Sequence, residues 1–76
     1  MDIEKYNKVF IETFNLVPNK LNIDLKYNKI PEWDSIGHMM LMSALEEEFK
    51  ITLETNDIID FSSYEKGKKI IGKFVK

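Results

Sequence analysis

Asp34 and Ser35 stand side by side where a polar, irregular segment gives way to an apolar run. The Ser35 hydroxyl is a group that can attack an electrophile or carry a covalent modification. At the start of a helix, free backbone N–H groups and the helix dipole favour a bound anion. We therefore predict that Ser35 is the attachment point of a phosphate-linked group at a helix N-terminus.

Asp34 is the better of the two residues to cap this helix. Either side chain has the oxygen that a cap requires. A serine that carries a covalent group is poorly placed to cap as well, so we assign the cap to Asp34 and expect the Ser35 hydroxyl to point outward. Gly37 is disfavoured inside a first turn, and we interpret it as leaving room beside Ser35.

The apolar spacing predicts an all-α domain with three longer helices, one short third helix and a long first loop. The helices are expected over residues 2–15, 35–50, 55–61 and 63–75. Thr55 is the predicted cap of the short helix, and residues 62–65 match a capping box for the last one. The side chains expected to face the core are Ile3, Tyr6, Phe10, Phe14, Leu41, Met42, Leu45, Phe49, Ile58, Ile59, Phe61, Tyr64, Ile71, Phe74 and Val75.

Within residues 16–33, the apolar side chains of Leu21, Ile23, Leu25 and Tyr27 alternate with polar ones, which is a strand pattern over seven positions. A strand needs a partner, and the only other short candidate is residues 51–53. We therefore predict a long connection held down by its apolar side chains, since long loops in small domains are usually anchored or functional. The expected anchors are Leu21, Ile23, Leu25, Ile30 and Trp33.

The chain of 76 residues predicts one domain, residues 1–76, with a composition typical of soluble globular proteins. It has no cysteine and one histidine, and its carboxylates lack a recognised ligand spacing, so we predict no disulfide and no metal site. No apolar run reaches the length of a membrane span, and the first residues lack a secretion signal. We expect a cytoplasmic monomer.

Charge is segregated along the chain. Residues 32–60 contain eight acidic residues and one lysine, whereas residues 61–76 contain one glutamate and five lysines. There is no arginine, so bidentate recognition of phosphates or bases is not available, and we predict no nucleic-acid binding. A basic partner that docks on the acidic middle of the chain is more plausible.

The Asp34-Ser35-Ile36 triplet is followed on the same predicted helix by Ala-Leu-Glu-Glu-Glu-Phe at residues 44–49. This combination resembles the acyl carrier protein family, and the resemblance covers essentially the whole chain. It implies a four-helix bundle of acyl-carrier type with 4′-phosphopantetheine joined to Ser35 through a phosphodiester. The terminal thiol of the arm would carry an acyl or aminoacyl thioester, which a chain without cysteine cannot do itself.

The resemblance also implies that the chain is not an enzyme but a partner of enzymes. These are a phosphopantetheinyl transferase, an acyl- or aminoacyl-loading ligase and downstream transferases. The docking surface of the family maps onto Ile36, Met39, Glu46 and Glu47, with Met40 and Ser43 adjoining it. The alternative for the glutamates is an ordinary solvated face.

Some features differ from the family pattern. The net charge of −2 is less acidic than that of carriers in fatty acid synthesis. Trp33, Gly37 and His38 look more like stand-alone carriers of specialised pathways, such as secondary metabolism or the modification of surface polysaccharides. We therefore predict a specialised carrier, with a housekeeping carrier of fatty acid synthesis as the alternative.

Two further functions compete with a carrier. Ser35 and His38 are three residues apart and could be neighbours on one helix face, as in a hydrolase, but a triad needs a third group, an oxyanion hole and a pocket. We instead predict that His38 is an exposed contact residue. The other alternative is an interaction module that keeps the fold but is never modified.

Overall fold

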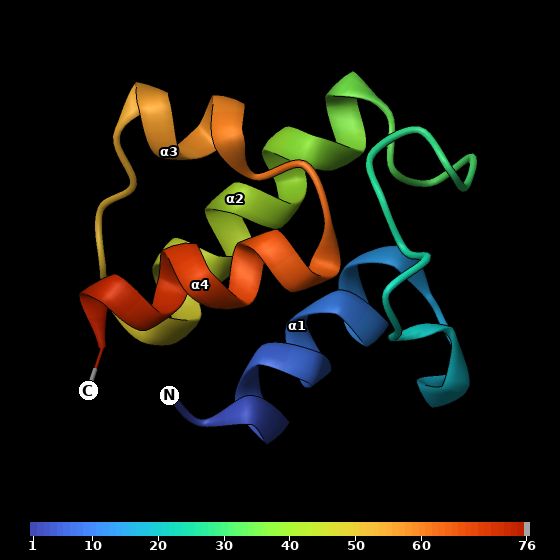
Figure 1. Cartoon of the computed structure of the whole chain (residues 1–76), viewed down its shortest axis with the longest axis horizontal. Coiled ribbons are helices and arrows are strands. Elements are labelled where there is room, and N and C mark those ends of the chain that lie inside the picture. The colour runs from blue at the N-terminus through green and yellow to red at the C-terminus, as the bar shows by residue number, and fades with distance from the viewer. Residues whose placement is uncertain (76) are drawn as a thin grey trace.

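The computed structural model describes residues 1–75 and contains four α-helices and one short 3₁₀ helix in that range (Figure 1). They are α1 (Ile3–Phe14), η1 (Pro18–Lys20), α2 (Ser35–Phe49), α3 (Thr55–Asp60) and α4 (Tyr64–Phe74). Three longer helices, a short third one and a long first connection were predicted, and the all-α prediction is confirmed. Lys76, the last residue of the predicted domain, lies outside the described residues.

The longer helices begin at polar side chains that accept a hydrogen bond from the first turn. Asp2 accepts from the Lys5 N–H of α1 at 3.2 Å, and Asp34 accepts from the Gly37 N–H of α2 at 2.8 Å. Each cap satisfies a donor that has no partner within the helix. The bounds lie within a residue of the predicted ones because these local signals fix them.

Two predicted caps are wrong by one residue. Thr55 is the first residue of α3, and Glu54 before it is the cap, with its N–H donating to Asp57 Oδ2 at 3.2 Å. Ser63, not Ser62, caps α4 and accepts from the Lys66 N–H at 2.9 Å. The Ser62 carbonyl is hydrogen-bonded to the long loop, which places the helix start one residue later.

The core is largely aromatic. Phe10 of α1 lies at its centre, with its ring centroid 5.0 Å from that of Tyr6, 5.5 Å from that of Trp33 and 5.4 Å from that of Tyr64. Trp33 comes from the long loop and is completely buried. Aromatic pairs in such tilted and edge-to-face arrangements contribute beyond their buried area. The loop that leads to Ser35 is therefore fixed to the centre of the domain.

Four side chains that were predicted to face the core are exposed instead: Ile3, Ile23, Ile59 and Phe74. Ile3 and Phe74 are the first and last residues of their helices and lie beyond the packed region. Ile59 stays exposed because its neighbours Ile58 and Phe61 take the positions that face the core. The other predicted core residues are buried or partly buried.

The long loop is attached to the start of α4 through its backbone. The Tyr27 N–H donates to the Ser62 carbonyl at 3.0 Å, and the Tyr64 N–H donates to the Leu25 carbonyl at 2.9 Å. These bonds form an isolated antiparallel bridge between Lys26 and Ser63. The strand-like alternation therefore does find a partner, but not at residues 51–53. Leu25 and Trp33 are the buried anchors of the loop, with Leu21 and Ile30 partly buried beside them.

Within residues 1–75, each helix is too short or too polar to cross a lipid bilayer.

Candidate functional site

Ser35 is the first residue of α2 and is exposed. Asp34 is the N-cap, the role predicted for it: its Oδ1 accepts from Gly37, and its carbonyl accepts from the His38 N–H at 2.7 Å. Because Asp34 takes the capping role, the Ser35 hydroxyl is not needed to satisfy the helix. The first-turn N–H groups of Ser35 and Ile36 have no acceptor within the helix, as at any helix start.

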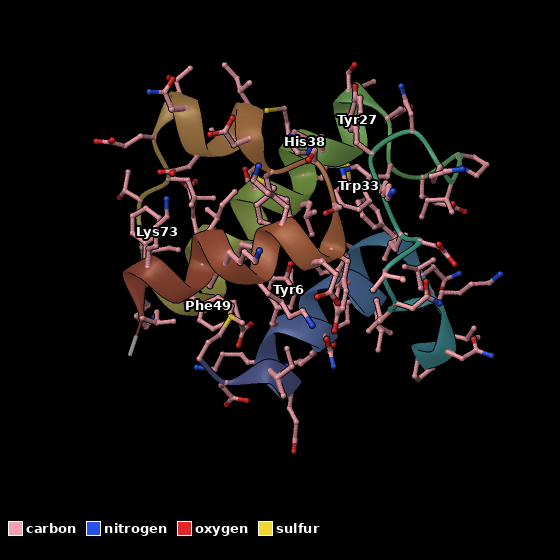
Figure 2. All side chains as sticks on the ribbon, in the orientation of Figure 1. Tyr6, Tyr27, Trp33, His38, Phe49 and Lys73 are labelled. Carbon is pink, nitrogen blue, oxygen red and sulfur yellow. The ribbon has the colours of Figure 1, made fainter. Side chains whose placement is uncertain are left out.

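The Ser35 hydroxyl has a partner that the sequence did not indicate. Its Oγ lies 3.0 Å from Tyr27 Oη, within hydrogen-bond distance, and either atom can be the donor. Tyr27 comes from the long loop, and its ring meets that of His38 nearly edge-on, with the centroids 5.4 Å apart. Figure 2 shows Tyr27, His38 and Trp33 gathered where this loop meets α2. No local pattern predicts this contact, because it depends on how the loop folds back.

His38 is half-buried and joins three parts of the chain, so the prediction of an exposed contact residue is wrong. The Trp33 Nε1–H donates to His38 Nδ1 at 2.9 Å. An indole N–H can only donate, so Nδ1 is the acceptor, and the proton sits on Nε2. That nitrogen then donates to the Ile58 carbonyl of α3 at 2.8 Å. The imidazole therefore links the loop, α2 and α3.

Gly37 does not leave room for an arm or an approaching enzyme. The space that a Cβ would occupy is filled, since that atom would lie 1.9 Å from the Glu32 carbonyl oxygen and 3.3 Å from the Phe14 ring. The glycine instead allows the loop backbone and α1 to approach the first turn of α2 closely. The predicted steric role of Gly37 is therefore corrected.

A groove of about 380 Å³ opens beside Ser35 between α2 and α3. Its apolar wall consists of Met39 from α2, Ile58 and Ile59 from α3, and Phe61. Tyr27, His38 and Ser62 supply the polar atoms at its edge. The groove combines the Ser35 hydroxyl with an apolar surface next to it, which is the general composition of a small-molecule site.

The predicted docking residues separate into two groups. A second, shallower hollow of about 650 Å³ lies on the other side of Ser35 and brings together Ile36, Met39, Met40 and Ser43. Ile36, Met39 and Met40 are more than half exposed. Four of the six predicted docking residues thus form a continuous, mostly apolar surface next to the attachment residue.

The two glutamates of that prediction lie elsewhere. Glu46 is half-buried, and its Oε2 accepts from the Leu53 N–H at 2.8 Å, so it supports the connection between α2 and α3. Glu47 is exposed and lines a different hollow, together with Glu12 of α1. Of these two glutamates, only Glu47 can therefore contact a partner without losing a hydrogen bond within the domain.

The groups with raised pKa values belong to the core and not to the site. Burial raises the pKa of the Tyr6 hydroxyl, which donates to the Tyr64 carbonyl at 2.8 Å. Burial also raises the pKa of the Tyr64 hydroxyl, which donates to Asn7 Oδ1. Among residues 1–75, no three histidine, aspartate or glutamate side chains meet in a group that could hold a metal ion.

No known protein family, curated protein or solved structure matches this chain significantly. Its function is therefore inferred from the residues around Ser35.

Proposed function

We propose that this protein is a carrier protein of the acyl-carrier type. It holds a 4′-phosphopantetheine arm on Ser35 and presents thioester-bound acyl or aminoacyl intermediates to the enzymes of a specialised biosynthetic pathway. The observation on which the proposal rests is that Ser35 is exposed at the first position of α2. Its hydroxyl is not needed as the helix cap, because Asp34 has that role.

The start of α2 and the groove beside Ser35 would both suit such an arm. The phosphodiester would lie near the first-turn N–H groups of α2, where the helix dipole stabilises an anion by about 0.3–1 kcal/mol. The groove lined by Met39, Ile58 and Ile59 offers an apolar surface directly beside the attachment atom. When bound, the arm supplies the thiol for thioester chemistry in a chain that has no cysteine.

In the attachment step, Ser35 provides the nucleophilic oxygen and the transferase provides the catalytic groups. The Ser35 Oγ–phosphorus bond forms as the pyrophosphate bond of coenzyme A breaks. The hydroxyl proton passes to a basic group of the transferase, and the adenosine bisphosphate part of the donor leaves. The chain needs only to present the hydroxyl, which agrees with the plain surroundings of Ser35.

The position of His38 favours a carrier over a hydrolase. A serine nucleophile needs a base within hydrogen-bond reach. Both ring nitrogens of His38 are engaged, Nδ1 with Trp33 and Nε2 with the Ile58 carbonyl, and the partner of Ser35 Oγ is Tyr27. Ser35 and His38 therefore do not form a nucleophile–base pair.

Intact-mass measurement tests the proposal. After co-expression with a phosphopantetheinyl transferase, the wild type is expected to gain the mass of one phosphopantetheine and Ser35→Ala to gain none. Thr52→Ala, which removes a different exposed hydroxyl, is the matched control and is expected to be modified fully.

If no competent transferase modifies the wild type, the carrier proposal is wrong and the unmodified interaction module replaces it. Labelling of the unmodified chain by a serine-hydrolase probe would support a hydrolase instead. Mass spectrometry of the native loaded species distinguishes a specialised pathway from fatty acid synthesis, because it identifies the cargo directly.

A further inference from the structure

We propose that Tyr27 is a positioning residue for the attachment site, which it serves through its hydrogen bond to Ser35. This inference rests on the carrier function proposed above. The two hydroxyl oxygens lie 3.0 Å apart, and Tyr27 lines the same groove as Ser35. The Tyr27 side chain is partly exposed, at 36%.

The fold determines where the Tyr27 hydroxyl lies. The backbone N–H of Tyr27 donates to the Ser62 carbonyl at 3.0 Å. The backbone N–H of the next residue, Asn28, closes a turn by donating to the Trp33 carbonyl at 2.8 Å. Asn28 has a φ of 68°, a left-handed conformation that asparagine tolerates better than most residues. The Tyr27 ring lies edge-on against His38, which is itself held at both nitrogens. The long loop therefore presents the phenol to Ser35 from a fixed backbone.

In the unmodified chain, this contact selects one side-chain conformation of Ser35. A free serine at a helix start samples three staggered χ1 conformations. A bond to Tyr27 holds Oγ toward the groove, so the attacking oxygen is already oriented when the transferase binds. Because only three conformations compete, the gain in rate from this selection is limited to about threefold.

In the modified chain, the hydrogen bond can have only one direction. The Ser35 Oγ is then an ester oxygen without a proton, so the Tyr27 hydroxyl can only donate. A phosphodiester oxygen within its reach is a better acceptor than a neutral one, since hydrogen bonds to charged groups are shorter and stronger. Tyr27 thereby orients the attached group along the apolar groove.

The first test uses the unmodified chain and does not depend on the carrier function. Three-bond Hα–Hβ couplings of Ser35, measured by NMR, are expected to report one χ1 conformation in the wild type and averaged values in Tyr27→Phe. Tyr64→Phe removes a phenol hydroxyl that bonds to Asn7 instead, and is expected to leave the Ser35 couplings unchanged. Averaged couplings in the wild type would overturn the proposal.

The second test measures modification by the transferase. For Tyr27→Phe we expect a two- to threefold lower kcat with the KM for the carrier chain unchanged. Partial unfolding would instead raise the apparent KM for the carrier chain, because a smaller fraction of it would be folded. In the modified chain, the ³¹P resonance of the phosphodiester is expected to differ between wild type and Tyr27→Phe but not between wild type and Tyr64→Phe.

The two proposals fail in different ways. If the wild type is modified and Tyr27→Phe shows the same kcat and the same ³¹P resonance, Tyr27 has no positioning role and the carrier function stands. If the wild type shows a single Ser35 conformation but no transferase modifies it, the carrier function is wrong and the role of Tyr27 in attachment is wrong with it.

Discussion

At the scale of single residues, the candidate site depends on the side chains of Asp34 and Ser35 and on the glycine at position 37. The capping role of Asp34 and the place of Ser35 at the start of α2 could be predicted from the sequence, because capping is a local property that is decided within one turn of helix. Gly37 could not, since its importance comes from the Glu32 carbonyl and the Phe14 ring, which reach it from the loop and from α1. A residue type alone does not show which distant atom lies beside it.

Gly37→Ala is expected to destabilise the protein. A Cβ at this position would lie 1.9 Å from a backbone oxygen, so the loop or the helix must shift. Overpacking of this kind costs about 1–3 kcal/mol, which outweighs the gain of up to about 1 kcal/mol from replacing glycine in a helix. The free energy of unfolding in urea measures the difference.

Gly72→Ala in α4 is the matched control, because a Cβ there meets nothing within 4 Å. It is expected to raise the free energy of unfolding by about 0.5–1 kcal/mol, since alanine is the better helix former. If the two substitutions changed stability in the same direction, the close approach at Gly37 would be refuted.

At the scale of elements, the site lies where the long loop, α2 and α3 meet. The helices could be predicted because their apolar periodicity and their capping residues lie within each segment. The contacts among the elements were not: Tyr27 meets Ser35 only because the loop pairs with Ser62 and Ser63, far along the chain. The alternation of apolar and polar residues in that loop indicated strand pairing. The bridge that forms is a single residue pair, which is too short for the alternation to identify the partner segment.

α3 is held mainly by its ends and by His38. None of its six residues is buried, whereas Leu53 before it and Phe61 after it are. The bond from His38 Nε2 to the Ile58 carbonyl attaches the middle of this helix to α2. Segments with few buried contacts open at low free-energy cost, so this one imidazole has a large share in keeping α3 in place.

His38→Phe is expected to lower the free energy of unfolding by about 1–3 kcal/mol, because it leaves the buried Trp33 indole N–H without an acceptor. Amide hydrogen exchange in α3 is expected to accelerate more than in α2. His38→Gln, which retains an acceptor and a donor, is the control and is expected to lose less stability. Equal stability of the wild type and both variants would contradict a linking role for His38.

At the scale of the whole molecule, the charges are arranged unevenly around a common aromatic core. The acidic residues lie mainly on α2, α3 and their flanks, and α4 is rich in lysine. Some of these charges are engaged internally: Lys68 pairs with Glu65 at 2.9 Å, and Glu46 accepts from Leu53. Glu47 remains exposed in the last turn of α2, and any attraction that it exerts on a basic partner would weaken with salt.

Glu47→Lys is therefore expected to slow modification by the transferase at low salt, with the rate approaching that of the wild type as the salt concentration rises. Glu47 is the suitable position because it is exposed, whereas a change at Glu46 would also remove the hydrogen bond to Leu53. Asp24→Lys, an equal change of charge on the exposed part of the long loop, is the matched control for net charge. A specific docking role predicts a larger effect at Glu47 than at Asp24. If the two variants have the same rate at every salt concentration, Glu47 has no specific docking role and belongs to a solvated face.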